Sequence, residues 1–236
     1  MTKKHKVKKA PLDKGLSAEW NDNHIDDFEN EIDIEFSFIT PALDVLWDLG
    51  HNGTGVDPTI NFTDHHTFAF LDGGPANDDT SFMSYERGGA PGNITSIQDN
   101  PVMTTAVWFN QYDTTGKVFE FGLIDNAETP FVANNHGAYF RLKDNLLYAV
   151  TGNGIAETEE DITPFIGMPE FAHCRIELSS TNAIFYVDDM ETASATITAT
   201  LPTNDLTIRY SARTNATTNS YLYVDAVGLT TRRYIG

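Results

Sequence analysis

The chain has 236 residues, of which 40% are hydrophobic and 11% aromatic, so it can bury a sizeable core and does not have a disordered composition. Its 34 acidic residues outnumber the 15 basic ones and give a net charge of −19. Because a body of this charge repels phosphates, we do not expect its bulk to bind nucleic acid.

The positive charge is concentrated at the start of the chain. Residues 1–14 hold six Lys and a single acidic residue, Asp13. We expect a polar arm there, either flexible or held by a partner, and it is the one part that could touch nucleic acid. No apolar segment follows these Lys residues and no run of about 18 apolar residues occurs, so we expect neither a signal peptide nor membrane insertion.

A short helix is predicted over residues 18–29. Ser17 is a suitable N-cap, and Trp20, Ile25 and Phe28 recur at helical spacing. We therefore treat residues 1–30 as a basic arm and attachment helix. The apolar face made by Trp20, Ile25 and Phe28 would dock on a partner or join copies of the chain, most simply in a trimer.

From Glu31 onward the hydrophobic pattern has a period of two, which predicts strands. Pro41 ends the first strand, and residues 42–58 hold Leu43, Val45, Leu46 and Trp47 and then a Gly/Asn/Asp loop. Turn residues then separate short runs, which we predict as strands at 59–63, 66–71, 81–86, 101–110, 117–124, 138–143, 146–151, 156–160, 172–179, 183–188, 193–199, 205–212 and 220–230. No helix of crossover length lies between them, so the sheets should be antiparallel.

One hairpin is especially clear in this pattern. The run His173–Leu178 alternates polar and apolar residues, the four turn-forming residues 179–182 follow, and Ala183–Asp188 is β-branched and aromatic. Cys174 falls on the apolar face of the first strand. We expect it to be a buried hydrophobe, and with a single cysteine the chain has no internal disulfide.

The C-terminal half resembles a known family. The residues that carry the likeness are Ile184-Phe-Tyr-Val-Asp-Asp, then Leu201-Pro202, then Tyr221-Leu-Tyr-Val-Asp-Ala-Val-Gly-Leu. Their order is similar to that in the concanavalin A-like lectin/glucanase superfamily, in its laminin G-like jelly-roll form. The resemblance implies an all-β fold, a two-sheet antiparallel jelly-roll β-sandwich over residues 31–236. It does not fix the function, since the superfamily includes lectins, glycosidases and structural modules.

A second resemblance involves Leu16–Ile25, which looks like the lead-in of sandwich domains in structural proteins of phages and archaeal viruses. It implies a virion protein that is assembled in the host cytoplasm beside other virion proteins.

The sharpest enzymatic signal is Glu31-Ile-Asp-Ile-Glu35. Its three carboxylates project from one strand face at intervals of about 6–7 Å. The string is similar to the E-x-D-x-E signature of glycoside hydrolase family sixteen. That likeness would make Glu31 the nucleophile, Asp33 the tuning group and Glu35 the acid/base of a retaining enzyme. Only an arm and a helix precede the motif, so we favour a solvated strand face.

Aromatic residues with a polar end are the candidates for sugar binding. They are Trp108, Tyr139 with Arg141 on the same face, and Tyr112 in a following loop. Packing within the sandwich is the alternative reading of these residues.

No His or Cys spacing indicates a metal site, so no cofactor is predicted. Ca²⁺ is left open by the acidic turns at Asp78–Asp79, Asp125–Asn126 and Asp188–Asp189.

The leading hypothesis is a structural or adhesive virion component (capsid, spike or tail) without catalysis, in contact with a cell-surface glycan. The alternatives are a free carbohydrate-binding module and a glycoside hydrolase that uses Glu31 and Glu35.

Overall fold

The structure is a computed structural model that describes residues 31–37, 47–62, 67–85, 92–109, 115–127, 129–163, 171–215 and 217–232. The basic arm, the helix expected over residues 18–29 with Trp20, Ile25 and Phe28, and the loop residue Tyr112 lie outside these ranges. Within the ranges, no helix has the length and hydropathy needed to cross a bilayer.

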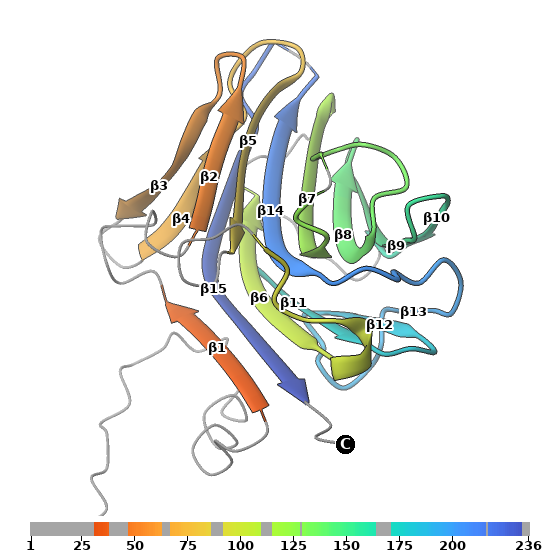
Figure 1. Ribbon diagram of the computed structural model, residues 1–236. Coiled ribbons are helices and arrows are strands. Elements are labelled where there is room, and N and C mark those ends of the chain that lie inside the picture. Colours follow the sequence, from red (N-terminus) through yellow and green to blue (C-terminus); the bar gives the residue numbers. More distant parts are fainter. Residues whose placement is uncertain are drawn as a thin grey trace, which may run out of the picture.

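Two antiparallel sheets pack face to face, which confirms the predicted all-β jelly-roll sandwich (Figure 1). The first sheet has the order β13 (Ala195–Ile197), β12 (Ala183–Val187), β11 (Phe171–Leu178), β6 (Val102–Phe109), β15 (Tyr221–Arg232), β4 (Thr67–Asp72) and β3 (Val56–Phe62). β1 (Glu31–Ser37) also pairs with β15. The second sheet has the order β10 (Glu157–Asp161), β9 (Leu146–Gly152), β8 (Gly137–Lys143), β7 (Lys117–Ile124), β14 (Thr207–Thr214), β5 (Asp79–Tyr85) and β2 (Trp47–Asn52). A 3-10 turn, Ile97–Asp99, precedes β6.

The core lies between the sheets and follows directly from the alternation of each strand. Met103 and Val107 of the first sheet and Phe121 and Tyr210 of the second are among its fully buried members. The Tyr210 hydroxyl donates to Thr105 Oγ1 at 2.8 Å, a hydrogen bond that crosses from one sheet to the other. The opposite side of each sheet is called its outer face below.

The predicted hairpin is present as β11 and β12. Its turn is closed by the Ser179 amide, which donates to the Asn182 carbonyl at 2.8 Å, and by the Asn182 amide, which donates to Ser179 Oγ at 3.1 Å. Cys174 is 1% exposed, as expected of a buried hydrophobe, and burial raises the pKa of its thiol.

The loop predicted between Trp47 and residue 58 is wrong in part, because β2 and the start of β3 lie there. Trp47 is buried in the core, and the missing side chain of Gly50 makes room for the Phe82 ring of β5. Pro58 falls where the register of β3 shifts between Val56 and Thr59, on a strand at the edge of the sheet. A Pro can stand at an edge bulge because no ladder hydrogen bond is required of it there.

Candidate functional site

The predicted sugar-binding residues lie on two different sheets. Tyr139 and Arg141 share the outer face of β8, and the Arg141 guanidinium carbon is 5.4 Å from the centroid of the Tyr139 ring. Trp108 lies on β6 of the first sheet, on the outer face of that sheet. The sequence therefore placed the first pair on one face correctly, but Trp108 does not join them.

Tyr139 and Arg141 do not form the exposed platform that the sequence suggested. Tyr139 is fully buried and Arg141 is only 9% exposed. Arg141 Nε donates to Glu120 Oε1 at 2.9 Å, and Nη1 donates to Glu157 Oε1 at 2.8 Å and also to Glu159. Nη2 donates to the Tyr139 hydroxyl at 3.0 Å. These partners occupy the planar face and edges of the guanidinium, so its role here is to bind β7, β8 and β10 together.

The electrostatics of this network agree with its geometry. Burial alone would lower the pKa of Arg141, but the hydrogen bond to Glu157 and the charge of Glu120 outweigh it and raise that pKa. Burial and the nearby Glu120 charge raise the pKa of Tyr139. Burial opposes ionisation of Glu157, yet its bonds from Arg141 leave its pKa below the ordinary value. Arg141, Tyr139 and Glu157 therefore keep their usual charge at neutral pH.

The loop between β7 and β8 closes over the network, which is why these outer-face residues are buried. The Phe131 amide donates to Glu120 Oε2 at 3.1 Å, and the Asn134 amide donates to Glu157 Oε2 at 3.2 Å. The Glu120 and Glu157 carboxylates both accept hydrogen bonds from a backbone amide and from the Arg141 side chain, so the network has a structural role. A carbohydrate ring has no access to Tyr139 in this arrangement.

Trp108 instead belongs to a row of aromatic side chains on the outer face of the first sheet. Register places Phe70 of β4 opposite Tyr223 of β15, and Tyr223 opposite Trp108 of β6. The ring centroids are 4.9 Å apart for Phe70 and Tyr223, and 4.8 Å apart for Tyr223 and Trp108. Phe70 and Trp108 are half-buried and keep part of their surface in solvent. We call Phe70, Tyr223 and Trp108 the aromatic row.

The aromatic row is supported on both sides. The Phe68 ring meets the Tyr223 ring edge-on at 4.9 Å, and the Tyr221 ring lies 5.4 Å from that of Phe70. Beside Tyr221, the Asp72 carboxylate accepts two hydrogen bonds from the Asn219 amide, at 2.8 and 2.9 Å. The surface thus has an apolar centre with polar groups at one end.

The E-x-D-x-E positions fall on the same sheet. β1 pairs with β15 on the side opposite β6, with Asp33 opposite Thr230 and Glu35 opposite Gly228. Leu229 belongs to the core, so its neighbours Gly228 and Thr230 are at outward positions. Because directly opposed residues share a face, positions 33 and 35 also belong to the outer face of the first sheet.

The acidic turns proposed for Ca²⁺ serve as hydrogen-bond acceptors. Asp79 accepts from the amides of Thr54 and Ala76, and Asp125 accepts from the side-chain amides of Asn93 and Asn204. Across the residues that the structure describes, no three His, Cys, Asp or Glu side chains are grouped as a metal site would require.

No protein-family model matches the chain, and no curated protein matches its sequence. Solved structures do match its fold. A protein of unknown function from Shewanella oneidensis MR-1 has 8% identity and a TM-score of 0.59, covering 86% of this chain and 87% of that one. The β-glucanase of Bacillus licheniformis has 11% identity and a TM-score of 0.58, covering 86% and 98%.

The carbohydrate recognition domain of Emp47p is a third neighbour, with 10% identity, a TM-score of 0.58, and coverage of 88% of this chain and 99% of that domain. At such identities the likeness concerns the fold alone. It supports the two-sheet jelly-roll sandwich expected from the sequence.

Proposed function

We propose that this protein is an adhesive module of a virus particle that binds a glycan on the outer face of its first sheet. The observation that carries the glycan-binding part is the aromatic row of Phe70, Tyr223 and Trp108, which lies on three adjacent strands with ring spacings of 4.9 and 4.8 Å. The neighbouring structures that are named for glucanase activity or carbohydrate recognition share this fold and add support.

The chemistry of the row suits a saccharide. Sugar rings present C–H groups on their faces and hydroxyls at their edges, so they bind where flat apolar rings are flanked by polar groups. The aromatic row supplies the rings, the tyrosine hydroxyls can accept or donate, and Asp72 and Asn219 supply polar groups at one end. Rigid aromatic side chains also lose little conformational entropy on binding.

The test is a glycan array probed with the full chain, followed by titration of any ligand found. Trp108→Ala removes an end of the row and should weaken binding at least about tenfold, the loss usual for an aromatic anchor. Tyr148→Ala is the matched control, because Tyr148 is a half-buried aromatic residue on the outer face of the second sheet. A folded protein that binds no glycan, or that binds equally well after Trp108→Ala, would refute the proposed site.

The virion part of the proposal rests on the sequence of residues 16–25 and on the basic arm. It predicts that the full chain self-associates, most simply as a trimer, and that removal of residues 1–30 makes it monomeric. Size-exclusion chromatography with light scattering compares the two. Equal, monomeric elution of both would count against an attachment role for these residues.

A glycoside hydrolase is the second candidate, favoured by one observation. Register places positions 33 and 35 of the E-x-D-x-E string on the same face of the same sheet as the aromatic row. A retaining enzyme would require turnover of a β-glucan that disappears in Glu31→Gln while the protein remains folded. If the full chain turns over no β-glucan, or if Glu31→Gln leaves turnover unchanged, this candidate fails.

A further inference from the structure

β14, an interior strand of the second sheet, carries two arginines with a serine between them on its outer face. Arg209, Ser211 and Arg213 of β14 alternate with Tyr210 and Ala212, which point into the core. Successive outward side chains on a strand are about 6.5–7 Å apart, so the hydroxyl lies between two guanidinium groups. Arg209 Nη1 donates to the Asp125 carbonyl at 3.3 Å, which fixes one end of this arrangement.

Two polar groups here lack the partners that burial normally requires. Ser211 is fully buried and its Oγ has no hydrogen-bond partner, and the buried Nε of Arg213 has none either. No carboxylate in the described part of the chain forms an ion pair with Arg213. A buried hydroxyl and a buried N–H without partners are unfavourable away from water, so their presence on neighbouring outward positions calls for an explanation.

Phe131 lies over these groups. Its amide donates to Glu120 Oε2 at 3.1 Å, and Glu120 is directly opposite Ser211 in the sheet. Its ring centroid is 4.9 Å from the Arg213 guanidinium carbon. Phe131 therefore lies between Glu120 and Arg213, above Ser211. Its φ of 65° is disfavoured for a bulky side chain, which marks a residue held in place by its contacts and at an energetic disadvantage.

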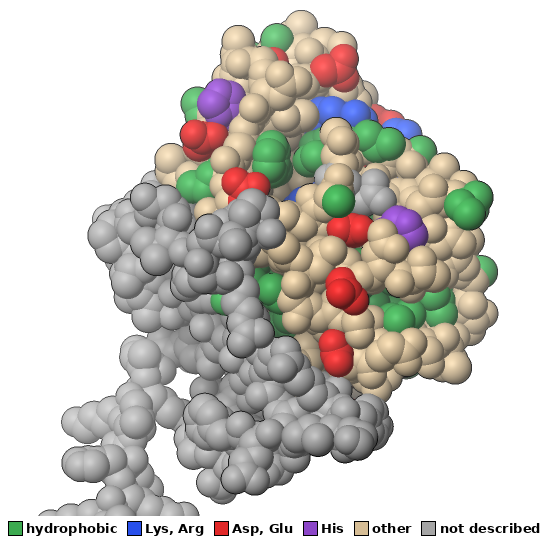
Figure 2. Space-filling model, viewed as in Figure 1, with side chains coloured by type: hydrophobic (Ala, Val, Ile, Leu, Met, Phe, Trp, Pro, Cys, Tyr) green, Lys and Arg blue, Asp and Glu red, His purple; other side chains and the backbone are tan. Residues whose placement is uncertain are grey.

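Basic side chains lie close to Ser211, while the nearest carboxylates belong to the Arg141 network. Arg141 Nε lies 2.9 Å from Glu120 Oε1, and the same guanidinium also pairs with Glu157 and Glu159 of β10. Four basic residues, Arg141, Lys143, Arg209 and Arg213, occupy outward positions on this sheet, in a chain with only 15 basic residues. In Figure 2 most of the basic side chains in view gather near the upper ends of β14 and β7, while the acidic ones are scattered.

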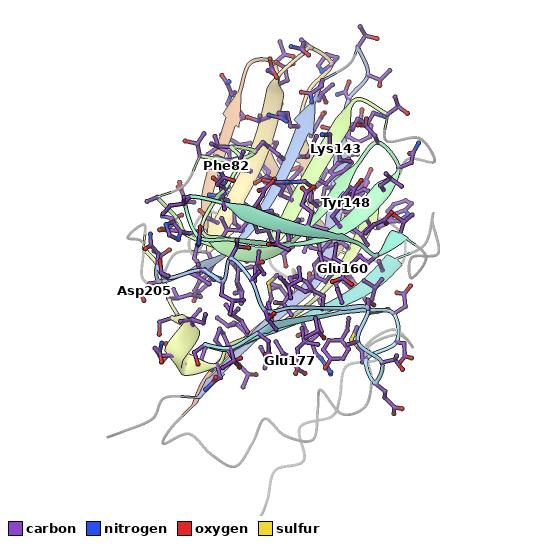
Figure 3. The ribbon with its side chains drawn as sticks, turned by 90° about the vertical axis from the view of Figure 1, so that its right-hand side faces the viewer. Phe82, Lys143, Tyr148, Glu160, Glu177 and Asp205 are labelled. Carbon is purple, nitrogen blue, oxygen red and sulfur yellow. The ribbon has the colours of Figure 1, made fainter. Side chains whose placement is uncertain are left out.

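The line of paired residues that crosses the second sheet through Ser211 has an aromatic residue at each end. By register, Phe82, Ser211, Glu120, Arg141 and Tyr148 follow one another across β5, β14, β7, β8 and β9. Figure 3 labels Phe82 and Tyr148, the two ends of this row, and Lys143 near Tyr148. A ligand that bears an anionic group would thus find an apolar contact at Phe82, which is directly opposite Ser211, whereas the Arg141 network separates it from Tyr148.

We propose that Ser211 and Arg213 form a binding site for an oxyanion group, a carboxylate or a sulfate ester, which becomes accessible when Phe131 moves aside. The guanidinium matches two oxygens of such a group with parallel N–H donors, and the serine hydroxyl donates to one of them. Arg209 adds positive charge. The site is on the opposite sheet from the aromatic row, so tests of the oxyanion site and of glycan binding at the aromatic row are independent of each other.

The experiment is a titration of the ¹⁵N-labelled full chain with acetate and, separately, with sulfate, at constant ionic strength maintained with chloride. We expect saturable shifts in the amide signals of residues 210–214 and 131, with a dissociation constant of about millimolar order for so small a ligand. Glucuronate and glucose 6-sulfate then show which oxyanion the site prefers when carried on a sugar.

Substitutions distinguish specific oxyanion binding at Ser211 and Arg213 from non-specific attraction of anions to basic residues. Arg213→Gln should weaken binding at least about tenfold, as expected for loss of charge-assisted hydrogen bonds, and Ser211→Ala by a smaller factor. Phe131→Gly removes the covering ring and relieves the backbone, so it should tighten binding. Arg175→Gln is the matched control, because Arg175 also stacks on an aromatic ring, that of Tyr186 at 3.9 Å, but is paired with Glu177 at 3.0 Å.

Each outcome decides the matter. Saturable binding that is lost in Arg213→Gln and kept in Arg175→Gln supports the site for whichever oxyanion binds. Shifts that rise linearly without saturation, or that are the same in Arg213→Gln, mean an adventitious ion only and overturn the proposal. Spectral dispersion of each variant shows that it is folded.

Discussion

Replacement of Arg141 by Met should destabilise the protein strongly. The substitution keeps the length and apolar stem of the side chain but removes the guanidinium that joins β7, β8 and β10. Glu120 would then lose its charged partner while its side chain remains 1% exposed. A buried carboxylate without a counter-ion is the costly product of this change, since its charge is no longer compensated by water or by protein.

The size of the effect follows from the exposure of each partner. Removing one member of a buried ion pair typically costs about 3–5 kcal/mol, and Glu120 accounts for that range. Glu159 is 37% exposed at its side chain, so loss of its contact adds only about 0–0.5 kcal/mol because water screens it. For a domain of this size, about 3–5 kcal/mol corresponds to a fall in Tm of roughly 6–20 °C.

Urea denaturation at pH 7, followed by tryptophan fluorescence, measures the free energy of unfolding of each variant. The double variant Arg141→Met/Glu120→Gln retains an acceptor for the Phe131 amide but removes the buried charge at position 120, so it should recover at least half of the loss. A cost of less than about 1 kcal/mol for Arg141→Met alone would show that water reaches Glu120. Such a result would refute a closed, structural network around Arg141.

Three further predictions concern other parts of the fold. Gly122→Ala should cost more than about 2 kcal/mol in urea denaturation, because a Cβ would lie 2.6 Å from Tyr139 Cα and 2.7 Å from the Ala138 carbonyl oxygen; a normal stability would mean that β7 and β8 can separate. The Cys174 thiol should react with a thiol reagent only at the rate of unfolding, since it is buried and its pKa is raised by that burial; rapid labelling under native conditions would contradict this. The pKa of Asp125 is depressed, because hydrogen bonds from Asn93, Ala127 and Asn204 outweigh its burial, so its contribution to stability is complete above its ordinary pKa. That contribution should disappear as pH falls below about 4, and unfolding curves of Asp125→Asn should show a weaker acid dependence over the same range.

The local features of the fold could be predicted from the sequence because local pattern determines them. The hairpin of β11 and β12 needs only alternation, a turn and a β-branched run, and it appears where expected. The loop expected after Trp47 was partly wrong because pairing with a distant strand, and not local pattern, decides the structure there. Trp47–Asn52 has Gly and Asn but little alternation, and it becomes a strand only because β5 offers it an edge.

The candidate site depended on pairings that no local pattern reveals. Trp108 was identified as an aromatic residue with a polar end, but its neighbours Phe70 and Tyr223 are far from it in the chain and meet it only through the register of β4, β15 and β6. Tyr139 and Arg141 were expected to be open because their strand alternates. The loop that carries Phe131 and the carboxylate of Glu120 closes over them, and neither could be anticipated without the fold.

The order of strands also constrains how the chain can reach this structure. β14 and β15, the last two strands along the chain, lie in the interior of the second and first sheets, between strands made much earlier. Until they emerge from the ribosome, β6, β7, β4 and β5 have unpaired edges and neither sheet can close. Folding should therefore wait until both strands have been made and should be slow, as for other topologies dominated by distant pairings, and a chain interrupted before Thr207 should aggregate instead of forming half a sandwich.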